Sequence, residues 1–274
     1  MTTNRRRWTV RVLAIVFIIA WVFPIYWMLN TAFKPRNGVL EDTPTFWPQR
    51  FSLDHFAEVF KSRTFLTSLT NSTIVTLVTV VVSVLVAFLA CAALTMYRFR
   101  GQRVLMIIIL AVQMIPGTAM LIPQFIVFNR FGMLDTYVGL IIAYVAMILP
   151  FSIWNMRGFF LAMPMSLFES ARVEGANEWQ ILWHITFPLA APGIISTSVF
   201  AFIHSWNDYL LTYTFMKDQS HYTLPVWLAS FSTPTGIDVG AQMAASVLFS
   251  LPVVIFFMIV QQRIGQGNVN GAVK

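Results

Sequence analysis

Residues 169–188 read Glu-Ser-Ala-Arg-Val-Glu-Gly-Ala-Asn-Glu-Trp-Gln-Ile-Leu-Trp-His-Ile-Thr-Phe-Pro, with the spacing E-x-A-x(3)-G-x(9)-I-x-x-P. This polar, helix-prone stretch separates two long apolar segments in a chain that is otherwise mostly apolar. Two interpretations follow from these residues alone. The stretch is either an amphipathic helix lying at the membrane surface or a docking element for a partner beneath the membrane.

The composition is that of an integral membrane protein. Of the 274 residues, 57% are hydrophobic and 11% are charged, whereas a soluble domain has about 25% charged residues. The single cysteine, Cys91, lies inside an apolar run, so an intrachain disulfide is excluded. A packing role for this cysteine is favoured over a redox role.

Six apolar segments are long enough to cross a bilayer as helices. A span needs about 20 mostly apolar residues, and open strands are excluded because lipid cannot satisfy their backbone groups. The chain is predicted to be an all-α membrane protein with a single transmembrane domain over 1–274. Its predicted parts are spans at about 12–33, 66–97, 104–129, 136–160, 189–216 and 239–262, a loop at 163–188 and a tail at 263–274.

Basic residues predict the orientation of these spans. With both termini in the cytoplasm, the inner side carries eleven basic and three acidic residues, and the outer side carries seven basic and eight acidic ones. Cytoplasmic loops of membrane proteins are enriched in Lys and Arg. The net charge of +7 is therefore a topology signal and does not indicate a nucleic-acid partner. The same bias places the 163–188 loop and the tail in the cytoplasm.

The loop carries the start signals of a first short helix. Ser166 and Glu169 have the spacing of a capping box, in which the serine accepts from a backbone N–H and the glutamate reaches back. Pro164 lies just upstream, where it does not interrupt the helix interior. We therefore expect a helix capped by Ser166.

A glycine turn and a second helix are expected to follow. Gly175 suits a left-handed or tightly packed turn. Asn177 and Gln180 offer a second capping pair. Because the residue before proline disfavours helical backbone, we expect the second helix to end before Pro188. The loop is thus predicted to be a rigid helix pair tied to two spans.

Side chains of the loop suit contact with a partner. Ala171 allows close backbone approach, and Glu169 and Glu174 can pair with basic groups. Three large apolar residues can anchor the helices: Trp179, Leu182 and Trp183. These features fit a docking element and an interfacial helix equally well.

The spacing of the loop resembles the EAA loop of ABC-importer permeases, which docks on a cytoplasmic ATPase. Nearly the whole chain resembles the MalG-like, carbohydrate-uptake branch of the maltose-transporter permease family. Outside the loop, the resemblance is carried by Asn71-Ser72, Arg98-Phe99-Arg100-Gly101, Ile115-Pro116-Gly117, Ile122-Pro123, Gly132-Met133-Leu134-Asp135-Thr136-Tyr137, Leu149-Pro150-Phe151, Arg157-Gly158-Phe159-Phe160 and Phe202-Ile203-His204-Ser205-Trp206-Asn207-Asp208. The chain departs from the family pattern at Ser170, Glu174 and Phe187, where Ala, Asp and Leu are usual.

The resemblance implies a type I importer permease fold with a cytoplasmic coupling helix between spans 4 and 5. It also implies which residues face the ATPase. In the loop these are Glu169, Ser170, Ala171, Glu174, Gly175, Ala176, Ile185 and Pro188. In the tail, which would reach into the ATPase dimer, they are Gly271, Ala272, Val273 and Lys274.

By the same resemblance, the chain is expected to be a non-catalytic permease subunit of an ATP-driven carbohydrate importer in a bacterial or archaeal cytoplasmic membrane. The solute would be a disaccharide, an oligosaccharide, an amino sugar or a glycerol-phosphate derivative. The implied partners are a second, MalF-like permease, two copies of a cytoplasmic ATPase, an extracytoplasmic solute-binding protein or lipoprotein, and membrane lipid. No cofactor is expected in this chain, because ATP would be bound by the ATPase subunits.

Polar residues in the fifth span are candidate pathway residues. His204 and Asp208 are four apart and share a helix face, and ionisable residues within spans are often functional. One interpretation makes them part of a hydrophilic cavity, with Trp206 and Asn207 near the solute. The other makes them hydrogen-bonding groups between helices. Both interpretations remain open from the sequence.

Other classes of membrane protein have less support. A self-contained secondary transporter or channel needs coupling carboxylates near the midplane or an inverted repeat, and Asp208 is the one carboxylate in a predicted span. A membrane enzyme needs a nucleophile–base pair, and none is readable. The four histidines, at 55, 184, 204 and 221, are too scattered for a metal site, and no phosphate-binding G-x(4)-G-K-[ST] motif occurs.

Overall fold

The computed structural model describes residues 2–40, 43–233 and 236–269. Contacts divide the chain into two compact units. Unit 1 comprises Met1–Leu66 and Trp227–Pro252, and unit 2 comprises Thr67–Val226 and Val253–Lys274. Three helices contribute to both units: α3 (Arg63–Met96), α12 (Leu224–Ala229) and α13 (Val239–Val269).

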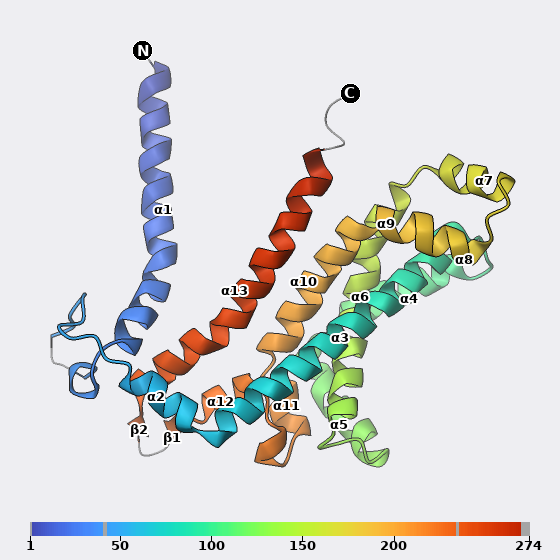
Figure 1. Ribbon diagram of the computed structural model, residues 1–274. Helices are drawn as coiled ribbons and strands as arrows, with labels where there is room; N and C mark the ends of the chain where they lie inside the picture. The colour runs from blue at the N-terminus through green and yellow to red at the C-terminus, as the bar shows by residue number, and fades with distance from the viewer. Residues whose placement is uncertain (1, 41–42, 234–235, 270–274) are drawn as a thin grey trace. The chain divides into compact units, whose positions relative to one another are not determined.

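Unit 1 is built around a long apolar helix and the loop that follows it (Figure 1). Helix α1 spans Thr2–Ala32 and is followed by the short 3-10 helix η1 (Arg36–Gly38) and by α2 (Asp54–Lys61). Strands β1 (Ser232–Thr233) and β2 (Gly236–Ile237) form a two-residue antiparallel pair. The loop folds back onto the end of α1, because Asn30 Nδ2 donates to the carbonyl of Thr45 at 3.0 Å.

Unit 2 contains the remaining helices. These are α4 (Gln102–Gln113), α5 (Gly117–Arg130), α6 (Tyr137–Leu161), α7 (Met165–Val173), α8 (Glu178–Gln180), the π-helix η2 (Ile181–Thr186), α9 (Phe187–Leu189), α10 (Ala191–Asn207), α11 (Leu210–Phe215) and the 3-10 helix η3 (Gln219–His221). Figure 1 shows α7, α8 and α9 together at one end of α6 and α10. Helix α6 makes its most extensive packing with α10.

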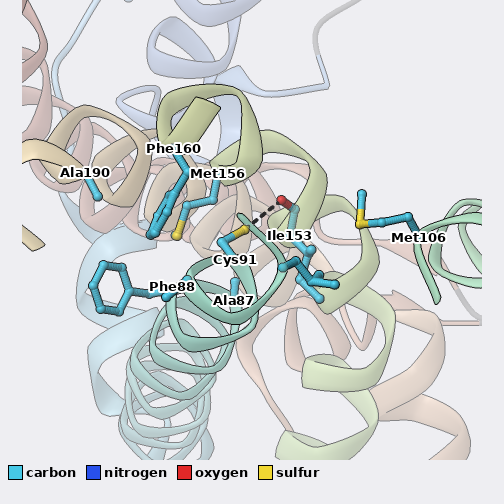
Figure 2. Packing of buried hydrophobic residues seen from close by; sticks show 10 residues of the cluster. Ala87, Phe88, Cys91, Met106, Ile153, Met156, Phe160 and Ala190 are labelled. Atoms are coloured by element: carbon cyan, nitrogen blue, oxygen red, sulfur yellow. Dashed lines mark hydrogen bonds between the residues drawn. The ribbon is translucent and has the colours of Figure 1, made fainter. Parts of the chain in front are cut away.

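The core of unit 2 lies where α3, α6 and the loop end of α10 meet. Figure 2 shows Cys91 and Phe88 of α3 facing Ile153 and Phe160 of α6. The thiol of Cys91 donates to the carbonyl of Ile153 at 3.1 Å, and the rings of Phe88 and Phe160 lie 5.5 Å apart. Small residues on α3 let the helices approach closely, so Cys91 has the packing role that its apolar surroundings predict.

Among the described residues, four helices are long and apolar enough to cross a membrane: those over Arg7–Ala32, Arg63–Met96, Tyr137–Leu161 and Val239–Gln261. The count rises to as many as six if each of two bent helix pairs is one span. The segment predicted as one span at 104–129 is bent by 101° between α4 and α5. The other pair, Glu178–Leu189 and Ala191–Asn207, is bent by 71°.

The first bend has a local cause. Pro116 lacks an N–H, and its backbone, with φ −58° and ψ 130°, does not continue α4. Helix α5 begins directly afterwards at Gly117. Pro123, Pro150 and Pro252 lie inside α5, α6 and α13 without ending them. Pro192 lies in the first turn of α10, directly after the second bend.

Candidate functional site

The loop at residues 163–188, called the coupling loop here after its predicted role, begins with α7 one residue after Pro164. Pro164 has extended backbone, with φ −65° and ψ 125°, and it occupies the N-cap position. The predicted cap at Ser166 is wrong, because that residue is already inside the helix, which begins at Met165 and has no side-chain cap. The fixed φ of the proline sets the start of the helix, so no capping serine is required.

The end of α7 forms a Schellman motif at Gly175. This glycine has φ +90°, in the left-handed region. The N–H of Gly175 donates to the carbonyl of Arg172 at 3.1 Å, and the N–H of Ala176 donates to that of Ala171 at 2.9 Å. These two bonds satisfy carbonyls at the helix terminus. The predicted glycine turn is confirmed.

The second helix begins with a complete capping box. Asn177 Oδ1 accepts from the N–H of Gln180 at 2.8 Å, and Gln180 Oε1 accepts from the N–H of Asn177 at 2.9 Å. This prediction is confirmed. Together with the Schellman motif, the box fixes both sides of the turn around Gly175.

The second helix does not end before Pro188, so that prediction is wrong. Helix α8 continues into the π-helix η2 and then into α9, which contains Pro188. Pro188 lies in the first turn of α9, directly after the π-helix, where a missing N–H costs least. Thr186 Oγ1 donates to the carbonyl of Ile181 at 3.1 Å in the π-helix. The chain therefore accommodates a proline whose missing N–H would otherwise break the helix.

An ion pair ties the two helices of the loop to α3. Arg172 Nε and Nη2 donate to the Glu178 carboxylate at 2.8 and 3.2 Å, and the hydroxyl of Tyr97 donates to the same carboxylate at 2.8 Å. The hydrogen bond from Arg172, and next that from Tyr97, lowers the pKa of the Glu178 carboxyl. Because the pKa is lowered, the contacts of the Glu178 carboxylate with Arg172 and Tyr97 are fully formed above the usual carboxyl pKa. They are lost only as the pH falls through the lowered pKa of Glu178.

The loop has a small core of its own. Phe168 and Ala171 of α7 are buried against Ile181, with Ala176 and Ile185 packed alongside. Three of the predicted coupling residues thus stabilise the helix pair: Ala171, Ala176 and Ile185. They hold α7 and η2 together and do not form the outer face.

The outer face of the loop carries the other predicted coupling residues. Glu169, Ser170, Glu174, Gly175 and Pro188 are all exposed. Val173 lies among them and is 89% exposed, and Trp179 is 65% exposed. An exposed valine and an exposed tryptophan on this loop are available for contact with another molecule. The predicted tail residues Gly271, Ala272, Val273 and Lys274 lie outside the described residues.

The fifth-span residues divide into two groups. Together with Ile203, His204, Asn207 and Asp208 line an open cavity of about 310 Å³. Trp206 does not join them, because it is 2% exposed and stacks on Phe202 with ring centroids 5.5 Å apart. The structure therefore places three of the four predicted pathway residues around one cavity and the fourth in the core.

Asp208 also joins helices, as the alternative interpretation proposed. Its Oδ2 accepts from the hydroxyl of Tyr144 at 2.9 Å and from the N–H groups of Leu211 and Thr212 at 3.0 and 3.2 Å. The carboxylate thereby caps α11 where α10 ends and links both helices to α6. Asp208 lines the cavity and also accepts hydrogen bonds between the end of α10 and the start of α11, so both interpretations have support.

Replacing Asp208 with alanine is expected to lower the stability of the chain by about 1–2 kcal/mol, because a cap and a buried hydrogen bond are lost together. Asp208→Asn should keep most of that stability, since the amide oxygen accepts the same bonds. Thermal unfolding in detergent micelles measures the difference. Equal midpoints for the alanine and asparagine variants would contradict the network.

Sequence reasoning missed two tyrosines that complete these sites. Tyr97 and Tyr144 bond to Glu178 and Asp208 from 81 and 64 residues away. No local spacing signals such a pair. The best available signal was their chemistry, since a hydroxyl on an apolar helix must find a polar partner. Among the described residues, no group of three or more His, Cys, Asp or Glu side chains could hold a metal ion.

A solved structure shares this architecture. The bacterial ABC transporter that imports the acidic polysaccharide alginate matches with a TM-score of 0.86 at 26% identity, over 96% of this chain and 98% of that one. A second structure, of a bacterial alginate ABC transporter with a pentasaccharide-bound periplasmic protein, matches with a TM-score of 0.69 at 16% identity, over 93% of each chain. The second likeness shows the fold alone.

Curated relatives are sugar-transport permeases. The diacetylchitobiose uptake system permease protein DasC of Streptomyces coelicolor is 40% identical over 96% of this chain and 95% of its own length. The trehalose transport system permease protein SugB of Mycobacterium tuberculosis is 29% identical over 92% of both chains. Such permeases are non-catalytic membrane subunits, and the resemblance to MalG-like permeases is confirmed.

The family model for "binding-protein-dependent transport system inner membrane component" matches residues 80–269, which include the coupling loop, the cavity and most of the core. The match therefore covers more than half of the chain and both of its candidate sites. This chain belongs to the family of binding-protein-dependent transport system inner membrane components.

Proposed function

We propose that this chain is the permease subunit of an ATP-driven, binding-protein-dependent importer for a carbohydrate, and that it forms half of the translocation pathway. The carbohydrate is a disaccharide, an oligosaccharide, an amino sugar or a glycerol-phosphate derivative. Relatives named for diacetylchitobiose, trehalose and arabinooligosaccharides support this solute class. No cofactor is bound by the chain itself.

The observation that carries the proposal is the rigid coupling loop. Two caps, an ion pair and a small core fix its shape, whereas Val173 and the carboxylates of Glu169 and Glu174 point to water. A segment with a fixed shape and an exposed apolar side chain suits docking into a cleft of a partner. The carboxylates beside that valine can pair with basic groups of the partner.

The proposed topology has six spans with both termini in the cytoplasm. Each bent helix pair counts as one span in this arrangement. The coupling loop then faces two copies of a cytoplasmic ATPase, which bind and hydrolyse the ATP. The remaining partners are a second, MalF-like permease beside this chain in the bacterial cytoplasmic membrane and an extracytoplasmic solute-binding protein.

A pull-down from native membranes tests the proposal. Tagged wild-type chain is expected to co-elute with an ATPase and a second permease, and Val173→Asp to lose the ATPase at least tenfold. The physical reason is that a charge replaces the apolar side chain that would be buried on docking. The amount of ATPase per permease in the eluate is the measurement.

Leu40→Asp is the matched control for this experiment. Leu40 is 81% exposed and lies in the loop after α1, so the same change from an apolar to an acidic residue is made away from the coupling loop. It should leave co-elution unchanged. Wild-type chain that elutes alone, without ATPase activity, would favour a self-contained transporter or channel instead.

A further inference from the structure

Lys34 is a buried cation near the outer end of α1. It follows the last residue of that helix by two positions and is 5% exposed. Its ammonium lies 5.6 Å from the centroid of the Trp27 ring. An aromatic face offsets only part of the cost of taking an ammonium out of water, so a buried lysine calls for an anion.

The side chain of Lys34 lines a polar cavity of about 330 Å³ in unit 1. Arg50 contributes a second cation, Asn37 and Gln49 contribute amides, and Thr45 contributes a hydroxyl. Among the described lining residues two are basic and none is acidic. Such a set recognises an oxyanion, and the volume exceeds what one water molecule needs.

Carboxylates of the described residues do not neutralise the two cations. Within the described ranges, no carboxylate oxygen lies within 4.0 Å of Lys34 or Arg50. The neighbouring Arg36 differs, because it is paired with Glu58 of α2. The loop thus pairs one of its basic residues with a carboxylate, and two others, Lys34 and Arg50, line the cavity.

The surroundings of the cavity are those of a lipid headgroup. The most apolar window of α1 has no buried residue, so its sides are available to acyl chains. Aromatic rings surround the end of the helix: Trp27 contacts Phe46, and Trp47 contacts Phe51, with centroids 5.7 and 5.8 Å apart. Aromatic rings of this kind gather at the level of the headgroups.

We propose that this cavity binds the phosphate group of an anionic phospholipid, with the acyl chains of that lipid lying along α1. The ammonium of Lys34 supplies the central charge, and Arg50 closes the rim. With the N-terminus in the cytoplasm, the lipid belongs to the outer leaflet. The site is separate from the coupling loop and from the cavity at Asp208.

Native mass spectrometry of the purified full chain tests this site. Phosphatidylglycerol is titrated against phosphatidylcholine, whose own ammonium compensates its phosphate. Wild-type chain is expected to bind one phosphatidylglycerol in preference to phosphatidylcholine. Lys34→Met should weaken phosphatidylglycerol binding by about tenfold or more, because a charge-assisted contact is lost.

Two variants serve as controls. Lys61→Met removes an exposed lysine of α2 in the same unit and should leave phosphatidylglycerol binding unchanged. Lys34→Arg keeps the charge and should retain most of the binding. If Lys34→Met does not fold, Arg50→Gln replaces it, since Arg50 is exposed and its loss should weaken binding about threefold.

Several results would overturn the proposal. Equal binding of the two lipids, or of wild-type chain and Lys34→Met, would exclude a lipid phosphate site. A weak site for a free anion has a dissociation constant of about 1 mM. Displacement of the lipid by inorganic phosphate at about that concentration would therefore point to a free anion instead. If Lys34→Met leaves lipid binding unchanged but captures less solute-binding protein, the cavity binds an acidic protein surface instead.

Discussion

Replacing Gly175 with valine is expected to reduce ATP hydrolysis by the co-purified transporter more than tenfold. Gly175 has φ +90°, and a Cβ added there would meet no atom within 4 Å. The penalty is therefore backbone strain, about 1–2 kcal/mol for an ordinary residue and more for a β-branched one. A loop that relieves this strain must break the two Schellman bonds and turn Val173 and Glu174 away from their present direction.

The ATPase activity per permease, measured in nanodiscs, gives the size of this effect. Gly175→Asn should retain much of the activity, because asparagine tolerates left-handed backbone. Gly158→Ala is the matched control: a Cβ there also meets open space, but the residue lies inside α6 with no left-handed φ. Activity of Gly175→Val within twofold of wild type would show that the shape of the turn does not matter for coupling.

Replacing Gly240 with alanine is expected to destabilise unit 1 by about 1–3 kcal/mol, because extra volume enters a filled core. A Cβ at Gly240 would lie 2.1 Å from Cε1 of His55. The ring of His55 is 2% exposed, so it has little space into which to move. Helix α2 and the start of α13 must therefore separate to admit a single methyl group.

A double-mutant cycle isolates this contact. His55→Ala removes the ring that the added methyl group would meet. The double variant with Gly240→Ala should therefore be more stable than the sum of the two single changes predicts. The expected difference is about 0.5–3 kcal/mol, the range for residues in contact. The free energy of unfolding is measured by titrating SDS into detergent micelles. Additive effects would show that the two residues do not touch, and Gly158→Ala again serves as the control.

The helical segments could be predicted from the sequence because a span is set by length and composition alone. Helices cover the runs at 12–33, 66–97, 136–160 and 239–262. The pair Pro116–Gly117 indicates a bending point in the run at 104–129, whereas the second bend was not predicted. Six prolines lie within the predicted spans, at positions 24, 116, 123, 150, 192 and 252. Only Pro116 and Pro192 lie where a helix starts after a bend, because neighbouring packing decides whether a helix tolerates the missing N–H.

The coupling loop shows the same division between local and distant causes. Gly175 and the Asn177–Gln180 box were predicted correctly, since both depend on residues at most five apart in the sequence. The start at Met165 was missed because Pro164 overrides the capping potential of Ser166. Passage through Pro188 was missed because a π-helix has no signature in residue spacing. The contacts of Tyr97 depend on the tertiary fold.

Cys91 has a practical consequence for the study of motion in this transporter. It is the chain's one cysteine, and it is fully buried with its thiol bonded to the carbonyl of Ile153. Maleimide and nitroxide reagents need an accessible thiolate, so they should leave wild-type chain unlabelled. Cysteines introduced at Val173 and Leu40, both widely exposed, would then carry probes in an otherwise native sequence. Distances between such probes could follow the opening and closing of the pathway during ATP turnover.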